Sequence, residues 1–346
     1  MALVGGYGNG KTHILRYIKH HMNHQFSRNY KARAIAGYVI TPGRSLVDTY
    51  RSFMQDLGRN FFIQLTWELL GKVALSRISQ GDEDYRNLEG DIETSLAEDP
   101  SRIRKYVEDG TIPQPSLMKH ARKALSPLVT NIDVANCLLK LLAGQTTFLA
   151  WRWLSGEPIL QEQRRKLKII SPIDGDDKAL SVFQDIRGIM RELGYQLVCM
   201  LIDEFELVEV LHHTQKQRFL NSIRHLIDLN PSGLCLIISC TPEVWKDIFM
   251  KYHAFSERIL REVPLKPLNQ ETIKTLIQEH LNLHRTEPIK EPDPMYPFTQ
   301  EAITHILQAS QGNVRRALAL CNIAIDLGIK QGDEWITPQT IRQIAR

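Results

Sequence analysis

Residues 5–12 have the residue types and spacing to bind the phosphates of a nucleotide. They fit the pattern G-x-x-x-x-G-K-[ST], with an apolar run before the glycines and a helix-like run after them. The glycines allow successive backbone N–H groups to turn toward one centre, and the helix N-terminus adds partial positive charge. The pattern therefore predicts a strand, a phosphate-binding loop and a helix, with the ligand contacted by Gly5, Gly6, Tyr7, Gly8, Asn9, Gly10, Lys11, Thr12 and His13.

Two side chains of this loop have specific expected roles. Lys11 would contact the phosphate oxygens, and the Thr12 hydroxyl would bind Mg²⁺. The alternative is a glycine-rich turn that contains a lysine by chance. A second motif further along the chain argues against that alternative.

The second motif is an apolar run, residues 197–202, that ends in Asp203 and Glu204. A strand that is apolar on both faces is typical of the centre of a parallel sheet, and ligands bind at the carboxyl ends of such strands. In this Walker B pattern, Asp203 would hold Mg²⁺ mostly through water, and Glu204 would orient and deprotonate the attacking water. The two motifs together predict binding and hydrolysis of ATP or GTP.

Residues 234–242 indicate another buried strand, and this one has hydroxyl side chains at its carboxyl end. A polar group there can hold the attacking water or the γ-phosphate. Thr241 is the first candidate and Ser239 the second. The alternative for Thr241 is that it caps a helix beginning at Pro242.

The composition is that of a soluble globular protein. The chain has 346 residues and a net charge of +4, which permits an anionic partner without requiring one. Its five cysteines form no C-x-x-C pair, so we expect reduced cysteines and a cytoplasmic location. No secretory signal is apparent, and the most apolar segment, residues 134–154, contains charged residues, so no membrane insertion is expected.

Most of the middle of the chain has a helical pattern. Residues 33–40 favour a second strand of the parallel sheet, and residues 45–168 are then mostly helical, with an acidic loop or exposed helix at 81–99. The histidines at 20, 21 and 24 have helical spacing, but a solvated helix end fits them better than a metal site, since no carboxylate or cysteine lies beside them. The tryptophans on apolar stripes are expected in the core.

Four stretches of the chain together resemble one protein family. The loop GGYGNGKTH, the run LIDEFE, the strand end IISCTPEVW and the stretch GNVRRAL are similar to those of AAA+ ATPases of the origin-recognition and initiator-loader type. The sequence most resembles the ATP-binding proteins of bacterial BREX-type phage-defence systems and transposition ATPases with a strand ending in Thr-Pro-Glu. The resemblance covers residues 1–45 and 176–346, and the helical block between them has no match.

The resemblance implies roles for two arginines. Arg258 occupies the arginine-finger position, from which it would act on the γ-phosphate of a neighbouring subunit. It fits this position better than Arg261, and a local salt bridge with Glu257 or Glu262 is the alternative. Arg315 matches the sensor 2 arginine, which reaches the γ-phosphate of its own subunit.

The predicted fold class is α/β, with a P-loop NTPase parallel sheet flanked by helices. Residues 1–45 and 170–265 would form the ATPase core, residues 46–169 a large helical insertion, and residues 266–346 a small all-α lid. The lid has four helical segments, and Asn269 and Thr299 are plausible N-caps. The family's winged-helix domain and its adenine-side segment have no counterpart, and only four residues precede Gly5, which suggests an N-terminally shortened chain.

These observations predict a Mg²⁺-dependent ATPase that acts as a homo-oligomer. By resemblance it would load or remodel something on nucleic acid, with duplex DNA as a candidate partner, in phage defence. The alternative is a nucleotide-gated signalling or assembly scaffold that recruits protein partners through the helical insertion without acting on DNA. A third interpretation is a fragment whose site is degraded.

Overall fold

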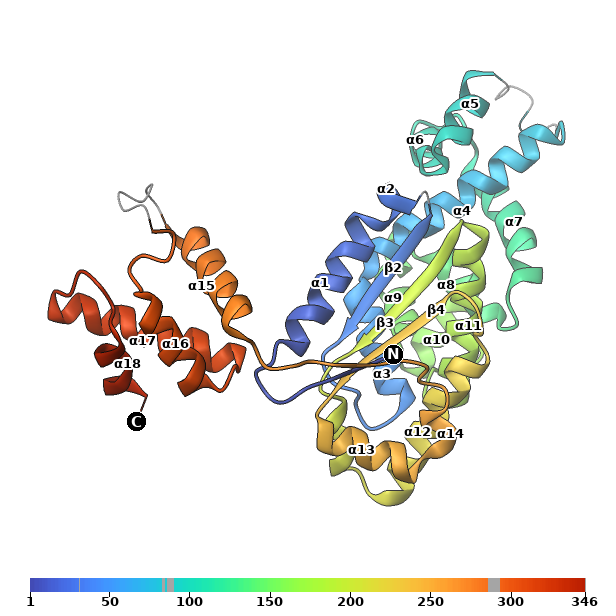
Figure 1. Ribbon diagram of the computed structural model, residues 1–346. Helices are drawn as coiled ribbons and strands as arrows, with labels where there is room; N and C mark the ends of the chain where they lie inside the picture. The colour runs from blue at the N-terminus through green and yellow to red at the C-terminus, as the bar shows by residue number, and fades with distance from the viewer. Residues whose placement is uncertain (31, 83–84, 86–89, 286–292, 346) are drawn as a thin grey trace. The chain divides into compact units, whose positions relative to one another are not determined.

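A computed structural model describes residues 1–30, 32–82, 85, 90–285 and 293–345 (Figure 1). Residues 83–84 and 86–89, within the acidic stretch considered above, therefore lie outside the described residues. The described residues form a five-stranded sheet of order β2-β3-β4-β1-β5. The strands are β1 (Ala2–Val4), β2 (Arg33–Val39), β3 (Tyr195–Ile202), β4 (Leu234–Cys240) and β5 (Glu262–Pro264). Strand β3 is parallel to both β2 and β4, which confirms the α/β class with a parallel sheet.

The chain divides into two compact units. The first comprises Met1–Ala2, Leu15–Ser239 and Lys246–Arg261, and the second comprises Leu3–Ile14, Cys240–Trp245 and Glu262–Arg346. The three-part division into core, insertion and lid stays a prediction.

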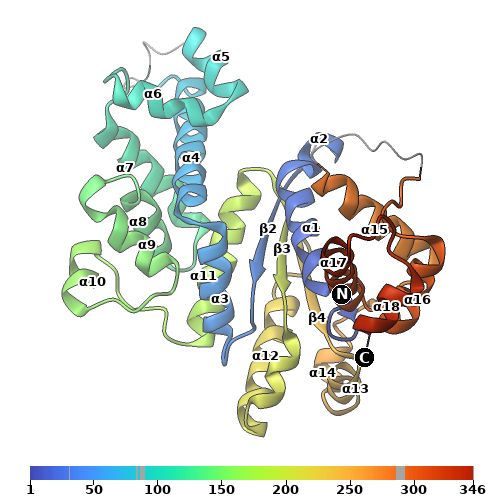
Figure 2. The ribbon, with the colours of Figure 1, turned by 90° about the vertical axis from the view of Figure 1, so that its left-hand side faces the viewer.

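In the first unit, helices α3 (Leu46–Leu57) and α11 (Asp176–Glu192) cover β2 and β3 (Figure 2). The rings of Phe53 and Phe183 meet between them, with centroids 5.9 Å apart. Opposite this contact Gly37 lies in β2, where a Cβ would approach the Phe53 ring to 2.5 Å. Glycine at this position therefore allows α3 to pack closely on the sheet.

Side chains occupy the outer edge of β2, which is the first strand in the sheet order. The amide of Asn23 donates to the Ala36 carbonyl at 3.1 Å and accepts from the Ala36 N–H at 2.7 Å. The Asp56 carboxylate accepts from the Tyr38 N–H at 2.6 Å. Backbone groups that point away from β3 thus find partners without another strand.

The remaining helices of the chain up to residue 256 include the predicted helical block. They are α1 (Lys11–His24), α2 (Phe26–Tyr30), α4 (Arg59–Ser79), α5 (Asp91–Glu98), α6 (Ile103–Glu108), α7 (Gln114–Leu125), α8 (Ile132–Lys140), α9 (Thr147–Leu154), α10 (Gln161–Leu167), α12 (His213–Asp228), α13 (Pro242–Lys251) and α14 (His253–Ser256). Trp67 and Trp153 are buried among them, as predicted, whereas Trp151 is only partly buried.

Two buried carboxylates tie this helical block to its neighbours. Asp133 accepts from the Ile170 N–H at 2.9 Å and lies 3.6 Å from Lys178 of α11. Asp185, also in α11, accepts from the backbone N–H groups of residues 130 and 131, each at 2.8 Å. Because buried carboxylates need such partners, these contacts fix the block against α11.

In the second unit, helices α15 (Gln270–His284), α16 (Gln300–Ser310), α17 (Val314–Gln331) and α18 (Pro338–Ile344) enclose an apolar cluster that includes Ile273, Phe298 and Ile303. Asn269 accepts from two backbone N–H groups at the start of α15, and Thr299 accepts from the Ala302 N–H, so both predicted N-caps are confirmed. Among the described residues, no helix is long and apolar enough to span a bilayer.

Candidate functional site

The loop of residues 5–10 joins β1 to the N-terminus of α1, as the sequence predicts. Its first residue is fixed to β4, because the Gly5 N–H donates to the Cys240 carbonyl at 3.1 Å. Gly8 and Gly10 have φ of 80° and 87°, a region that residues with a Cβ avoid. The loop therefore has the backbone needed to direct N–H groups toward an anion at a helix N-terminus.

Lys11 begins α1, and its side chain folds back onto the loop. Its Nζ donates to the Gly5 carbonyl at 2.7 Å and to the Gly6 carbonyl at 3.3 Å, and the residue is only 8 % exposed. It also lies 5.5 Å from the ring centroid of the exposed Tyr7. The ammonium is thus held inside the loop, where phosphate oxygens can replace the two carbonyls. Thr12 and His13 follow it on the exposed side of α1.

Asn313, which the sequence interpretation did not select, connects the loop to α17. Its Nδ2 donates to the Tyr7 carbonyl at 2.5 Å and to Asn9 Oδ1 at 3.0 Å, and its Oδ1 accepts from the Arg316 N–H as the N-cap of α17. A Cβ on Gly8 would lie 2.6 Å from Asn313 Oδ1. The close approach explains why the loop needs glycine there.

Arg315, the second residue of α17, also contacts the loop. Its backbone N–H donates to the Gly8 carbonyl at 3.1 Å, and its side chain is exposed. The carbonyls of Tyr7 and Gly8 are therefore both bonded to the N-terminal end of α17. The predicted sensor arginine thus belongs to the same unit as the predicted phosphate loop.

Asp203 follows the last residue of β3 and is 2 % exposed. Its Oδ2 accepts from the Tyr38 hydroxyl at 2.7 Å, and its Oδ1 accepts from the Ser239 hydroxyl and from the Glu204 N–H. The strand register explains this arrangement, since Ile202 pairs with Val39 on one side and Ile238 on the other. Side chains from β2 and β4 therefore converge on the carboxylate.

Tyr38 is the second residue of the candidate site that the sequence interpretation did not select. Burial raises its pKa, and so does its hydrogen bond to the Asp203 carboxylate. The phenol therefore stays a neutral donor to the Asp203 carboxylate. A carboxylate oxygen is the kind of ligand that Mg²⁺ takes in proteins.

Glu204 adopts a left-handed backbone conformation, with φ 49° and ψ 39°. This conformation is uncommon for residues other than glycine and is often found at functional sites. The Glu204 side chain is exposed, whereas the Asp203 side chain beside it is buried. The two adjacent carboxylates thus have different surroundings.

The two hydroxyl residues at the carboxyl end of β4, Ser239 and Thr241, also differ. Ser239 is fully buried and donates to Asp203. Thr241 is buried as well, and its carbonyl accepts from the Trp245 N–H at 2.9 Å at the start of α13. Ser239, the second candidate for holding water, is therefore engaged with the carboxylate.

Arg258 makes a local salt bridge. Its Nε lies 2.6 Å from Asp228 at the end of α12, and its Nη1 lies 3.7 Å from Glu257. The hydrogen bond and charge of Asp228 raise the pKa of Arg258. Glu262, the other expected local partner, instead accepts from the Trp245 indole N–H at 2.8 Å.

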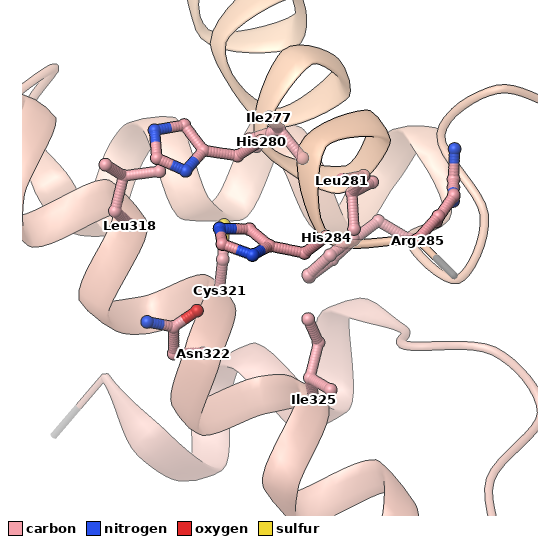
Figure 3. A pocket seen from close by; sticks show the side chains of 10 residues that line it. Ile277, His280, Leu281, His284, Arg285, Leu318, Cys321, Asn322 and Ile325 are labelled. Carbon is pink, nitrogen blue, oxygen red and sulfur yellow. The ribbon is translucent and has the colours of Figure 1, made fainter.

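A separate cavity of about 410 Å³ lies between α15 and α17 (Figure 3). The imidazoles of His280 and His284 extend from α15 toward Leu318, Cys321 and Asn322 of α17, and the other lining residues are mostly apolar. None of the residues predicted to bind nucleotide lines this cavity.

Comparison with known families gives one match. Residues 118–318, more than half of the chain, match the family described as BREX system ATP-binding protein BrxC/D. The matched range contains Asp203, Glu204, Thr241, Arg258 and Arg315, and it begins after the phosphate loop. No curated protein matches the chain.

Proposed function

Since the chain belongs to the BREX system ATP-binding protein BrxC/D family, we propose that it is a Mg²⁺-dependent ATPase of phage defence. In this proposal it acts in the cytoplasm as a homo-oligomer that loads or remodels a complex on nucleic acid. The observation that carries the proposal is the Asp203 carboxylate, which three donors orient at the carboxyl end of a buried parallel strand. Such strand ends are where α/β sheets bind their ligands.

Each of these residues has a separate role in the proposed hydrolysis of ATP. The loop amides and Lys11 bind the phosphates, and Thr12 and Asp203 hold Mg²⁺, which would neutralise charge on the phosphate oxygens. Glu204 takes a proton from the attacking water. Thr241 holds that water, a role for which it is preferred because Ser239 already donates to Asp203. This proposal brings the two motifs together around one nucleotide.

Two arginines complete the proposed site. Arg315, at the helix end that is bonded to the loop, contacts the γ-phosphate of its own subunit. Arg258 leaves Asp228 on assembly and contacts the γ-phosphate of a neighbouring subunit, where it stabilises charge in the transition state. The local salt bridge then keeps Arg258 from acting before assembly.

The variant Glu204→Gln tests the catalytic assignment. Glutamine has the shape of glutamate and tolerates the left-handed backbone, as Gln311 does in this protein, but it cannot accept the proton. ATP turnover should fall at least about 100-fold, the usual contribution of a general base, while ATP binding persists. Phosphate release and ATP binding are measured in parallel, with Glu192→Gln, an exposed carboxylate of α11, as the control. Normal turnover in Glu204→Gln would remove Glu204 from the mechanism.

The same assay separates the loader from the scaffold. A nucleic-acid loader should hydrolyse ATP faster when duplex DNA is added, and the effect should weaken with salt. A scaffold should assemble with ATP and show no response to DNA. Stimulation of turnover by DNA is therefore the result that the loader requires.

A further inference from the structure

The positive charge of this chain is concentrated near its amino end. Residues 1–47 contain seven Lys and Arg residues and no Asp or Glu. The whole chain has 43 Lys and Arg against 39 Asp and Glu, so 36 cations and 39 anions remain in the other residues. The net positive charge therefore comes from one segment, a pattern that favours an anionic partner at that segment.

Two of these cations have structural roles. Lys19 forms a salt bridge with Asp56 at 2.7 Å, and Arg33 forms one with Glu68 at 2.7 Å. Arg16 and Arg28 are instead exposed on α1 and α2, and the guanidinium of Arg16 lies 5.6 Å from the Tyr38 ring centroid. Arg16 also makes a side-chain hydrogen bond with Tyr38, and both arginines keep an exposed side chain that an anion can reach.

Exposed aromatic rings lie among these cations. Tyr17 and Tyr30 are each 63 % exposed, although tyrosine usually buries its ring. The ring of Tyr17 stacks on His21 with centroids 6.3 Å apart, and Phe26 supports Tyr30 at 4.7 Å. Both rings are thus held by a neighbour and still exposed to solvent.

The order of these side chains gives the surface a regular arrangement. Arg16, His20 and His24 succeed one another at four-residue spacing, about 6 Å apart along the helix axis. The rings of His20 and His24 lie 4.7 Å apart. We define the α1–α2 face by its exposed members, which are Arg16, Tyr17, His20, His24, Arg28 and Tyr30.

We propose that the α1–α2 face binds a single strand of nucleic acid, with phosphates at Arg16 and Arg28 and bases stacked on Tyr17 and Tyr30. Cations that track a backbone and aromatic rings that stack bases are the two elements of single-strand binding. A lipid surface fits less well, because the apolar residues Leu15 and Met22 of α1 are buried and cannot insert into a membrane. An acidic peptide would account for the two arginines but not for the exposed rings of Tyr17 and Tyr30.

This proposal depends on the proposed function only in taking nucleic acid as the client, and it can be tested without ATP. Binding of a fluorescent 20-nucleotide mixed-sequence DNA strand to the full chain is followed by anisotropy at two salt concentrations. The double variant Tyr17→Ala/Tyr30→Ala should bind the strand at least about tenfold more weakly, since each stacked base contributes substantially. Phe148→Ala, which removes an aromatic residue that is 59 % exposed elsewhere, should have no effect.

The arginine contact has its own readout. Arg28→Ala should reduce the slope of log affinity against log salt by about 0.7, the value for one phosphate contact on a single strand. Arg104→Ala, which removes an exposed arginine of α6, should leave the slope unchanged. The substituted residues are at the surface, and circular dichroism is used to check that each variant is folded.

Three results would overturn the proposal: no binding of the strand at low salt, unchanged affinity in the double tyrosine variant, or preference for duplex DNA with no effect of the tyrosines. ATP turnover distinguishes this failure from failure of the proposed function. If the strand does not bind but Glu204→Gln still abolishes turnover, only the α1–α2 face is wrong. If the strand binds but no ATP is hydrolysed, the proposed ATPase is wrong and the face remains.

Discussion

Replacing Asn313 with serine should weaken ATP binding and leave helix α17 intact. The two ends of the Asn313 amide have different tasks, since Nδ2 donates to Tyr7 and Asn9 of the loop while Oδ1 caps α17. Serine retains a capping oxygen but has no amide to reach the loop. The variant therefore removes the tether without removing the cap.

The expected magnitude follows from the two lost hydrogen bonds, which measure 2.5 and 3.0 Å. A hydrogen bond at a partly exposed position contributes about 0.5–1 kcal/mol, so the pair contributes about 1–2 kcal/mol. This energy keeps the loop in one conformation before ATP arrives. In the variant, part of the binding energy of ATP has to order the loop instead, so the affinity for ATP falls about 5- to 30-fold.

Calorimetric titration with a slowly hydrolysed ATP analogue and Mg²⁺ measures the effect. Asn269→Ser is the matched control, because Asn269 also caps a helix with its side chain but makes no hydrogen bond to the phosphate loop among the described residues. Asn313→Ala should lose the tether and the cap together, so its thermal stability should drop by about 1 kcal/mol as well.

One result would refute this reasoning. If Asn313→Ser bound the analogue as tightly as the unaltered protein while Asn313→Ala only unfolded earlier, Asn313 would be a helix cap and nothing more. The conformation of the phosphate loop would then be determined by the residues of the loop itself.

Two further variants test the sheet. Tyr38→Phe removes the hydroxyl that donates to Asp203. It should raise the Mg²⁺ concentration needed for ATP turnover about 10- to 100-fold, because a hydrogen-bond partner of a metal ligand is lost. An unchanged Mg²⁺ titration would contradict this. Gly37→Ala places a methyl group against the Phe53 ring and should destabilise the fold by about 1–3 kcal/mol, whereas Gly188→Ala in α11 should be neutral or stabilising. Thermal unfolding of both variants measures the difference, and equal stability would argue against the close packing of α3.

Local signals in the sequence were sufficient for much of the fold. The strand predicted at residues 33–40 is β2, Arg33–Val39. The caps at Asn269 and Thr299 were also predicted. Each of these features depends on residues within one turn or one strand, so the pattern of side chains carries the information.

The contacts that orient the candidate site depend on the fold as a whole. Tyr38 and Asp203 are 165 residues apart, and they meet only because β2 and β3 pair in one particular register. Asn313 and Tyr7 are separated by 306 residues. Strands β2 and β3 are covered on both faces of the sheet, so no alternation of polar and apolar residues reveals which side chains share a face.

The conformation of single residues was also beyond the sequence. Nothing in the letters around Glu204 indicates a left-handed backbone, because only glycine and asparagine signal it clearly. A local salt bridge with Glu257 or Glu262 was the alternative role for Arg258. Glu257 does lie 3.7 Å away, but the shortest salt bridge is to Asp228, the last residue of α12. That contact depends on how α14 and the turn after it pack against α12.

The side chains along the outer edge of β2 restrict how copies of this protein can associate. An edge strand with unpaired backbone groups can pair with a strand of another molecule, and repeated pairing of this kind produces open-ended fibres. Here Asn23 and Asp56 occupy the hydrogen-bonding groups that an incoming strand would use. The protein is therefore protected against polymerising through this strand.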